Sequence, residues 1–376
     1  MAAFLMGCVG TQVACAMGLE TERVGEYGMQ GINYWDEFEY SKLKLLLNNE
    51  KVNSILDVRN GMKKMDEQFP ISIELHLTDN CNLNCEWCTD KSLRQNKAVM
   101  DLQVIKRLFR EFWQHGTGVT LEGGGEPTLH PDFKEIVAAG KASNIDMGLI
   151  SNGTVDISDC IDGLKWVRIS LDSSTQDEYK REKGVDCFER VLGNLEKMSK
   201  ARNPMDTFIG VGYVLTTRNQ SNLVELIKQL DSIGIDYIYL RPVEESGDIT
   251  PSLESLLDLR KKLAELTANT RIRYMLAISD RIVDRNAGLP CIAHSLTSVI
   301  HANGEVALCE KRRTDGIILG NVYESSFEEI WVSPYREQIS QKLLNAECQG
   351  GCSACRITGF NMIFEQLEKV HSKHFI

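Results

Sequence analysis

Long apolar stretches are missing from the sequence, since no run reaches the roughly 18 residues that a membrane-spanning helix requires. Basic side chains are in the minority, with 42 Lys and Arg against 53 Asp and Glu, and the formal net charge is −11. Nucleic acid and anionic membrane surfaces, which attract basic proteins, are therefore poor candidates for partners. Repeats and low-complexity tracts are also missing, and a composition of 25% charged and 43% hydrophobic residues excludes a disordered or fibrous chain.

The first residues, MAAFLMGCVGTQVACAMG, lack the basic segment of a secretory signal, and Gly7, Gly10 and Gln12 interrupt their apolar core. We therefore expect a cytoplasmic protein. The sequence has twelve cysteines, more than an ordinary cytosolic enzyme needs, and they are not spaced as in a small secreted disulfide framework. Under reducing conditions, clustered thiols are expected to be metal ligands rather than disulfides.

Strand-like and helix-like segments alternate from residue 71 onward. Ile71, Ile73 and Leu75 alternate with polar residues, which is the period-two pattern of a strand. Six strands are expected, at 71–78, 118–124, 147–153, 166–172, 208–216 and 237–243. Helices are expected between them, at about 101–115, 131–142, 187–202 and 219–233. This alternation predicts an α/β fold with parallel strands joined by right-handed crossovers.

Four segments divide the chain. Residues 71–245 hold the alternating strands and helices, and residues 246–290 are expected to form a helical linker containing a helix at about 251–268. Residues 291–376 hold five of the cysteines and an expected hairpin that turns at Asn303-Gly304, which indicates a second, smaller domain. Residues 1–70 have no clear role and contain helical pieces at about 34–48 and 50–66.

Three cysteines follow the first strand directly. The segment LTDNCNLNCEWCTD places Cys81, Cys85 and Cys88 in a C-x3-C-x2-C loop. Thiolates select zinc or iron–sulfur clusters, but structural zinc needs four ligands and no fourth Cys or His lies nearby in the sequence. Three thiolates on a four-iron cluster leave one iron open to another ligand. A zinc site completed from elsewhere in the chain, or three buried thiols, are the alternatives.

This segment resembles the hallmark of the radical SAM (S-adenosylmethionine) superfamily, including the aromatic Trp87 before the last cysteine. The resemblance covers about residues 71–245 and implies a partial (βα)6 TIM-like barrel. It further implies a [4Fe-4S] cluster on Cys81, Cys85 and Cys88, whose open iron binds the amino and carboxylate groups of SAM. An electron from a donor such as flavodoxin or ferredoxin would then cleave SAM to a 5′-deoxyadenosyl radical, which abstracts hydrogen from a substrate.

A glycine-rich segment after the second strand agrees with this resemblance. It reads Glu122-Gly-Gly-Gly-Glu-Pro127, in which glycine lets the backbone approach a ligand and Glu126 can accept a bond from an amine. In the family, such a segment binds the amino group of SAM, which implies that role for Gly124, Gly125 and Glu126. A plain glycine-rich turn would explain the glycines but not the acid.

Polar residues also end the third and fourth strands, where barrel side chains face the active site. By resemblance, Asn152, Ser170 and Asp172 are candidates for binding the ribose and carboxylate of SAM, although each could instead cap the following helix. Leu240 or Arg241, in the sixth strand, is a candidate for flanking the adenine.

The C-terminal cysteines form a second group. Cys291 and Cys309 lie at the ends of the predicted hairpin, and C-x3-C-x2-C follows at Cys348, Cys352 and Cys355. Four thiolates complete a four-iron cluster, so this cluster would be structural or redox-active rather than SAM-binding. Zinc is the alternative.

The same stretch resembles the SPASM/twitch extension of radical SAM enzymes, a small C-terminal iron–sulfur domain. A full SPASM domain has cysteines for two auxiliary clusters, whereas five are present here. We therefore expect one auxiliary [4Fe-4S] cluster on Cys291, Cys309, Cys352 and Cys355, with Cys348 as a possible substitute.

The predicted function is hydrogen abstraction from a substrate by the SAM-derived radical. A single auxiliary cluster favours oxidation or rearrangement of a small sugar- or cyclitol-like molecule, and an alcohol oxidation would need a base. Arg241, Glu244 and Glu245 are the nearest candidates for that base. One alternative is a maturase that modifies a peptide or protein, although residues 1–70 show no strand-rich pattern of a peptide-recognition domain. Another is a non-catalytic electron carrier, which would not need Glu126.

Overall fold

The computed structural model describes residues 44–59, 62, 68–243, 247–267, 270–277, 290–345, 355 and 357–368. Most of the N-terminal segment lies outside this part of the chain, and so does most of the helix expected at 34–48. Four residues that the sequence singled out also lie outside it: Glu244, Glu245, Cys348 and Cys352. The second expected N-terminal helix is present as α3 (Asn49–Arg59), and most of residues 60–66 lie outside the described part of the chain.

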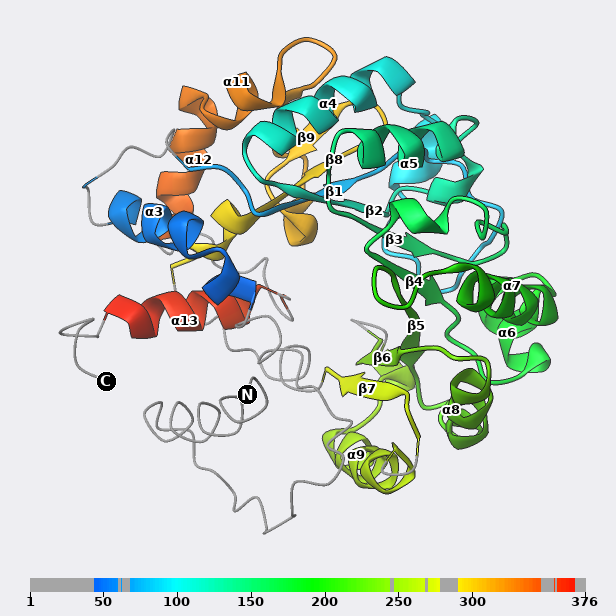
Figure 1. Ribbon diagram of the computed structural model, residues 1–376. Helices are drawn as coiled ribbons and strands as arrows, with labels where there is room; N and C mark the ends of the chain where they lie inside the picture. Colours follow the sequence, from blue (N-terminus) through cyan, green and yellow to red (C-terminus); the bar gives the residue numbers. More distant parts are fainter. Residues whose placement is uncertain are drawn as a thin grey trace, which may run out of the picture.

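The predicted α/β partial barrel is confirmed, with the six expected strands side by side and parallel. They are β1 (Ser72–Leu75), β2 (Gly118–Leu121), β3 (Met147–Ser151), β4 (Trp166–Ser170), β5 (Phe208–Leu215) and β6 (Tyr237–Pro242). The expected helices are α4 (Leu102–Gln114), α5 (Phe133–Ala142), α7 (Phe188–Ala201), α8 (Leu223–Ser232) and α9 (Leu253–Thr267). Figure 1 shows the helices on the outside of a fan of strands.

Among the described residues of 71–277, one strand and one α-helix were missed. The segment predicted as a helical linker also holds β7 (Arg273–Leu276), which pairs in parallel with β6 as a seventh strand, so that prediction was wrong in part. Helix α6 (Gln176–Lys183) was not expected because Tyr179 is its one large apolar residue. Its caps could have identified it, since Thr175 accepts a bond from the Glu178 amide and Gly184 ends it at a φ of 76°.

The C-terminal hairpin extends the barrel sheet. It consists of β8 (Thr297–Ile300) and β9 (Glu305–Ala307), antiparallel as expected, with Gly304 in the turn at a φ of 86°. Strand β8 pairs in parallel with β1, and β10 (Ile318–Asn321) pairs with β9, so that the ten strands form one sheet. The helices α11 (Phe327–Trp331), α12 (Pro334–Leu344) and α13 (Thr358–Glu368) complete the region.

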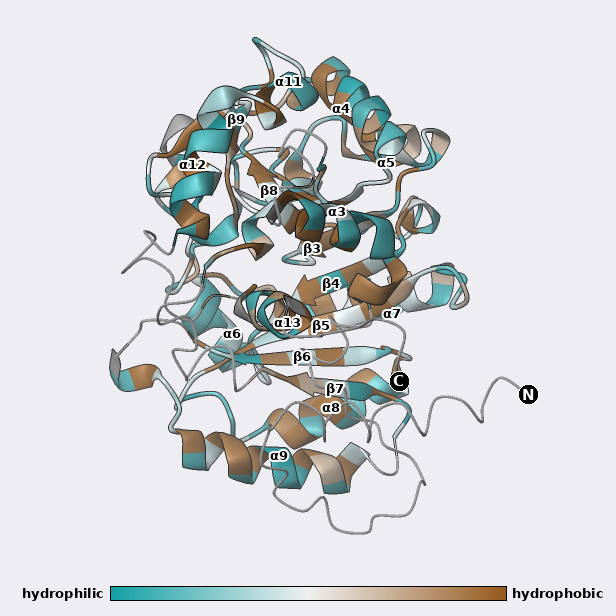
Figure 2. Cartoon of the chain, turned by 90° about the vertical axis from the view of Figure 1, so that its left-hand side faces the viewer, coloured by the Kyte–Doolittle hydropathy of each residue, from teal (hydrophilic) through white to brown (hydrophobic). Residues whose placement is uncertain are grey.

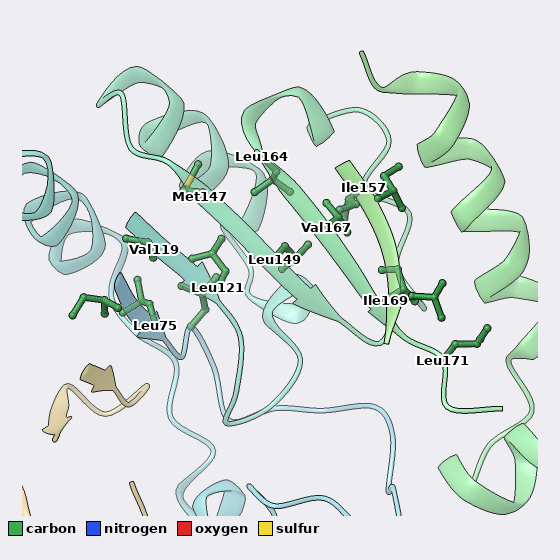
Figure 3. Packing of buried hydrophobic residues seen from close by; sticks show 14 of the residues in the cluster. Leu75, Val119, Leu121, Met147, Leu149, Ile157, Leu164, Val167, Ile169 and Leu171 are labelled. Carbon is green, nitrogen blue, oxygen red and sulfur yellow. The ribbon is translucent and has the colours of Figure 1, made fainter. Parts of the chain in front are cut away.

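The main core lies between the sheet and its helices. Along β4, Val167 and Ile169 are buried, whereas Trp166, Arg168 and Ser170, on the opposite face, are half-buried. Figure 3 shows the buried side chains of the neighbouring strands packed beside one another, and each such side chain contributes about 1.5–3 kcal/mol. In Figure 2 the strands are mainly hydrophobic and the outer helices show hydrophilic surfaces. None of the described helices is long and apolar enough to cross a membrane.

Candidate active site

A cavity of about 720 Å³ lies at the carboxyl ends of the strands. Most of the residues predicted for the site line it: Cys81, Cys85, Trp87, Cys88, Gly124, Gly125, Glu126, Asn152, Ser170, Asp172 and Arg241. Leu240 does not, because it is fully buried in the core on the helical side of β6. Trp87 also packs against the buried side chains of Val214, Val243 and Ile249.

Arg94 holds the cysteine loop together, a role that no sequence pattern indicated. Its guanidinium donates to the Cys88 Sγ at 2.6 Å, to the Leu83 carbonyl at 3.2 Å and to the Gly124 carbonyl at 3.1 Å. Burial raises the pKa of the Cys81 thiol, and the positive charge of Arg94 partly offsets that rise. Arg94 therefore joins the cysteine loop to the glycine-rich loop and favours thiolates in the first.

The glycine-rich loop packs directly against the start of the cysteine loop. The amide of Gly125 donates to the Thr78 carbonyl, and that of Glu126 donates to the Asn80 carbonyl, each at 2.7 Å. A Cβ at Gly125 would lie 2.0 Å from the Asn80 carbonyl oxygen, and Gly124 has a φ of 60°. Gly125 is therefore required for the contact between the two loops, a reason that the sequence alone did not suggest.

Glu126 is buried and already has partners in its own chain. Its Oε1 accepts bonds from the Thr128 hydroxyl at 2.6 Å and the Ser151 hydroxyl at 2.7 Å, and its Oε2 accepts one from the Asn152 amide at 2.7 Å. Burial raises the pKa of the Glu126 carboxyl, and these hydrogen bonds counteract the rise. Oε2 keeps the capacity to accept one more donor, such as an ammonium group.

Asn152 also links the cysteine loop to the barrel. Its Nδ2 donates to the Asn82 Oδ1 at 2.8 Å, and its Oδ1 accepts bonds from the amide and hydroxyl of Thr154. Ser170 lines the cavity, and its hydroxyl makes no hydrogen bond with another described residue. Of these two residues, Ser170 has its hydroxyl available for a ligand.

Asp172 and Lys183 form a buried ion pair in the cavity wall. Asp172 has a φ of 57°, and its Oδ1 accepts a bond from the Val214 amide at 2.7 Å. Burial lowers the pKa of Lys183, but the charges of Asp172 and Cys85 outweigh it and hold that pKa above its usual range. Lys183 in turn counteracts the rise that burial causes in the pKa of Cys85. The sequence analysis missed Lys183 together with helix α6.

The C-terminal region supplies one wall of the cavity, through the segment 310–314 that follows Cys309. Arg313 donates to the Asp90 Oδ1 at 2.7 Å and to the Thr89 hydroxyl at 2.8 Å, so that it joins this segment to the residues directly after Cys88. Burial raises the pKa of the Asp90 carboxyl, but the charge and hydrogen bond of Arg313, together with His76 and His301, outweigh burial and hold that pKa below its usual range. The two cysteine regions are thus connected by one ion pair.

Among the C-terminal cysteines, Cys291, Cys309 and Cys355 belong to the described residues. Cys309 and Cys355 are buried, and Cys291 is half-buried. Burial raises the pKa of the Cys309 thiol, and the negative charges of Cys291 and Cys355 raise it further, which indicates that the three sulfur atoms are neighbours. No three His, Cys, Asp or Glu side chains of the described residues are placed to hold a single metal ion. A four-iron cluster is larger than one ion and needs its thiolates spread around it.

Sequence comparisons define the class of protein. The Radical SAM superfamily matches residues 75–230, and the SPASM iron–sulfur cluster-binding domain matches residues 291–356. The chain belongs to the radical SAM superfamily and has a C-terminal SPASM domain. It is an enzyme whose radical SAM domain binds a [4Fe-4S] cluster and SAM, and whose SPASM domain binds auxiliary iron–sulfur clusters.

Similar proteins include a maturase and a cofactor-modifying protein. Mycofactocin maturase MftC of Mycobacterium tuberculosis is 24% identical over 78% of this chain and 78% of its own. The cofactor-modifying protein of tungsten-containing aldehyde ferredoxin oxidoreductase in Pyrococcus furiosus is 24% identical over 69% of this chain and 80% of its own. Streptococcus suis SuiB, solved with its precursor peptide SuiA, has the same fold, with a TM-score of 0.63 and 16% identity over 97% of this chain and 84% of its own.

Proposed function

We propose that the protein is a radical SAM maturase that modifies a side chain of a peptide or protein. Two relatives support this proposal, since mycofactocin maturase is named for maturation and SuiB was solved with a precursor peptide. The sequence predicted a sugar- or cyclitol-like substrate, with a maturase as an alternative. The relatives named above favour the maturase alternative over the sugar- or cyclitol-like substrate.

One structural observation supports the proposal most directly. The segment 310–314 of the C-terminal region forms a wall of the same cavity that Cys81, Cys85 and Cys88 line. A substrate that reaches these cysteines therefore meets both regions of the chain. Because this wall is rich in charged groups, including Glu310, Lys311 and Arg313, it suits a polar substrate such as a peptide.

Different residues of the cavity would bind the cluster, SAM and a carboxylate group. When bound, the cluster and SAM supply the radical that removes a hydrogen atom from the substrate. Cys81, Cys85 and Cys88 would hold the cluster, and Oε2 of Glu126 would accept a bond from the amino group of SAM. Lys183 has donors beyond the one that Asp172 uses, so it can receive a carboxylate beside Cys85.

The test is an anaerobic assay of the reconstituted enzyme with reductant and SAM. Candidate precursor peptides encoded beside the gene are compared with cyclitols and sugars, and both 5′-deoxyadenosine and the mass of each candidate are measured. We expect a peptide to raise 5′-deoxyadenosine formation and to change in mass. Stimulation by a cyclitol or sugar alone, with every peptide unchanged, would contradict the proposal.

A further inference from the structure

Arg168 lies on the inner face of the barrel, in the middle of β4. Its neighbours Val167 and Ile169 are buried in the core on the other face, whereas Arg168 and Ser170 line the cavity. The residues paired with them on β5 are Gly210 and Gly212. A cationic side chain therefore reaches the floor of the cavity, two residues before a candidate SAM-binding serine.

Two aromatic rings hold the Arg168 guanidinium. Its central carbon lies 4.8 Å from the centre of the Tyr239 ring and 5.8 Å from that of the Trp166 ring. Such contacts fix the plane of a guanidinium and leave the N–H groups at its edge available for a planar anion. The rings therefore orient Arg168 without using its hydrogen-bond donors.

The guanidinium of Arg168 makes no hydrogen bond or ion pair with another described residue. Three other cations of the cavity differ in this respect: Lys183 pairs with Asp172, Arg313 with Asp90, and Arg94 donates to Cys88. A half-buried guanidinium without an acid loses part of its hydration and gains no compensating bond. A carboxylate that arrives with a ligand would provide that bond in the bidentate geometry that arginine favours.

Glycines on the neighbouring strands make room for this arrangement. A Cβ at Gly212 would lie 3.6 Å from the Cγ and Cδ of Arg168, so the arginine stem lies directly over that glycine. A Cβ at Gly148 would lie 2.0 Å from the Trp166 ring, and one at Gly210 would lie 2.2 Å from the Tyr237 ring. Glycine in the interior of a strand weakens that strand, and it often marks a site where another group approaches the backbone closely. The inner face of the barrel is thus shaped around Arg168 and its aromatic neighbours.

We propose that Arg168 binds a carboxylate group of the substrate. In a peptide substrate this group is an acidic side chain or the chain end. This inference rests on the proposed function for the class of substrate, although the carboxylate site itself depends only on the cavity. Arg168 would fix the substrate on the β4–β6 side of the cavity.

The test uses a pair of probes that differ in one charge. Glutamate blocked as its N-acetyl, N-methylamide derivative has one carboxylate, and the equally blocked glutamine is its neutral isostere. Both are titrated calorimetrically into the reconstituted, SAM-loaded enzyme. We expect the acid to bind about tenfold more tightly than the amide, because a hydrogen bond between two charged groups is stronger than one to a neutral amide.

Variants assign this preference to one residue. Arg168→Gln should remove the preference for the acid, and Arg168→Lys should retain a part of it because the charge remains but the bidentate geometry is lost. Arg190→Gln removes an exposed arginine from α7 and should keep the full preference. Equal binding of acid and amide to the wild type, or an unchanged preference in Arg168→Gln, would overturn the inference.

The outcome is separable from that of the proposed function. An acid preference that depends on Arg168, in an enzyme that modifies no peptide, would keep the carboxylate site and reject the peptide substrate. Modification of a peptide by an enzyme that binds acid and amide equally would keep the proposed function and reject the carboxylate site.

Discussion

The two groups of cysteines differ in what surrounds their sulfur atoms. Cys81, Cys85 and Cys88 are half-buried around a cavity, and the cations Arg94 and Lys183 oppose the effect of burial on Cys81 and Cys85. At Cys309, neighbouring thiols and Glu310 add to the effect of burial. The pKa is raised at Cys81, Cys85 and Cys309, but cations limit the rise at the first two, so Cys309 depends more on its metal for the deprotonated form.

The largest effect is expected from removing one thiol in each group. Cys85→Ala should abolish 5′-deoxyadenosine formation, because two thiolates cannot hold the cluster that binds SAM. Cys309→Ala should retain SAM cleavage and lose the modified product, since its cluster does not bind SAM. Anaerobic assays of both products measure the difference. If Cys309→Ala also stopped SAM cleavage, the two groups would not be independent.

The ion pair between Arg313 and Asp90 tests the connection between the two groups. Arg313→Gln leaves the Asp90 carboxylate buried and unpaired, so the free energy of unfolding should fall by about 3 kcal/mol. The variant with both Arg313→Gln and Asp90→Asn should recover a part of that loss. Denaturant titrations give the coupling energy, and a coupling near zero would show that the ion pair does not join the regions.

Gly125 tests the packing of the first region alone. Gly125→Ala places a methyl group against the Asn80 carbonyl, and overpacking of this kind costs about 1–3 kcal/mol. The variant should also bind SAM more weakly, as equilibrium dialysis would measure. Gly193→Ala is the matched control, because its Cβ would meet no atom within 4 Å and alanine favours the helix. Equal SAM affinity of the two variants would contradict the assigned role of Gly125.

An effect confined to acidic pH comes from His76, which follows β1 and lies beside His301 of the C-terminal region. Burial lowers the pKa of His76 to about 3 in the folded protein, whereas its pKa in the unfolded chain is about 6.5. Between these two pH values the unfolded chain binds a proton at His76 that the folded protein does not bind. Its contribution to stability is full above pH 6.5 and is lost as the pH falls toward 3, at about 1.4 kcal/mol per pH unit. His76→Gln should flatten this slope between pH 6.5 and pH 5 in denaturant titrations. An unchanged slope would show that other groups cause it.

Sequence reasoning succeeded where the signal was local. The strands β1–β6 have apolar periodicity, and Cys81, Cys85, Cys88 and Glu126 lie in short motifs with a chemical reason for each residue. The residues it missed act across the chain, since Arg94 reaches Cys88 and Gly124 while Arg313 reaches Asp90 from a distant segment. Strand β7 was missed because a short strand inside a segment dominated by α9 has little periodicity of its own.

The central claim is that one group of cysteines is open to SAM and the other is closed. Electron paramagnetic resonance of the reduced enzyme, recorded with and without SAM in the wild type, Cys85→Ala and Cys309→Ala, tests it most directly. We predict that SAM changes the signal that depends on Cys85 and leaves the signal that depends on Cys309 unchanged. A SAM-induced change in the Cys309-dependent signal, or none in the Cys85-dependent one, would contradict this account.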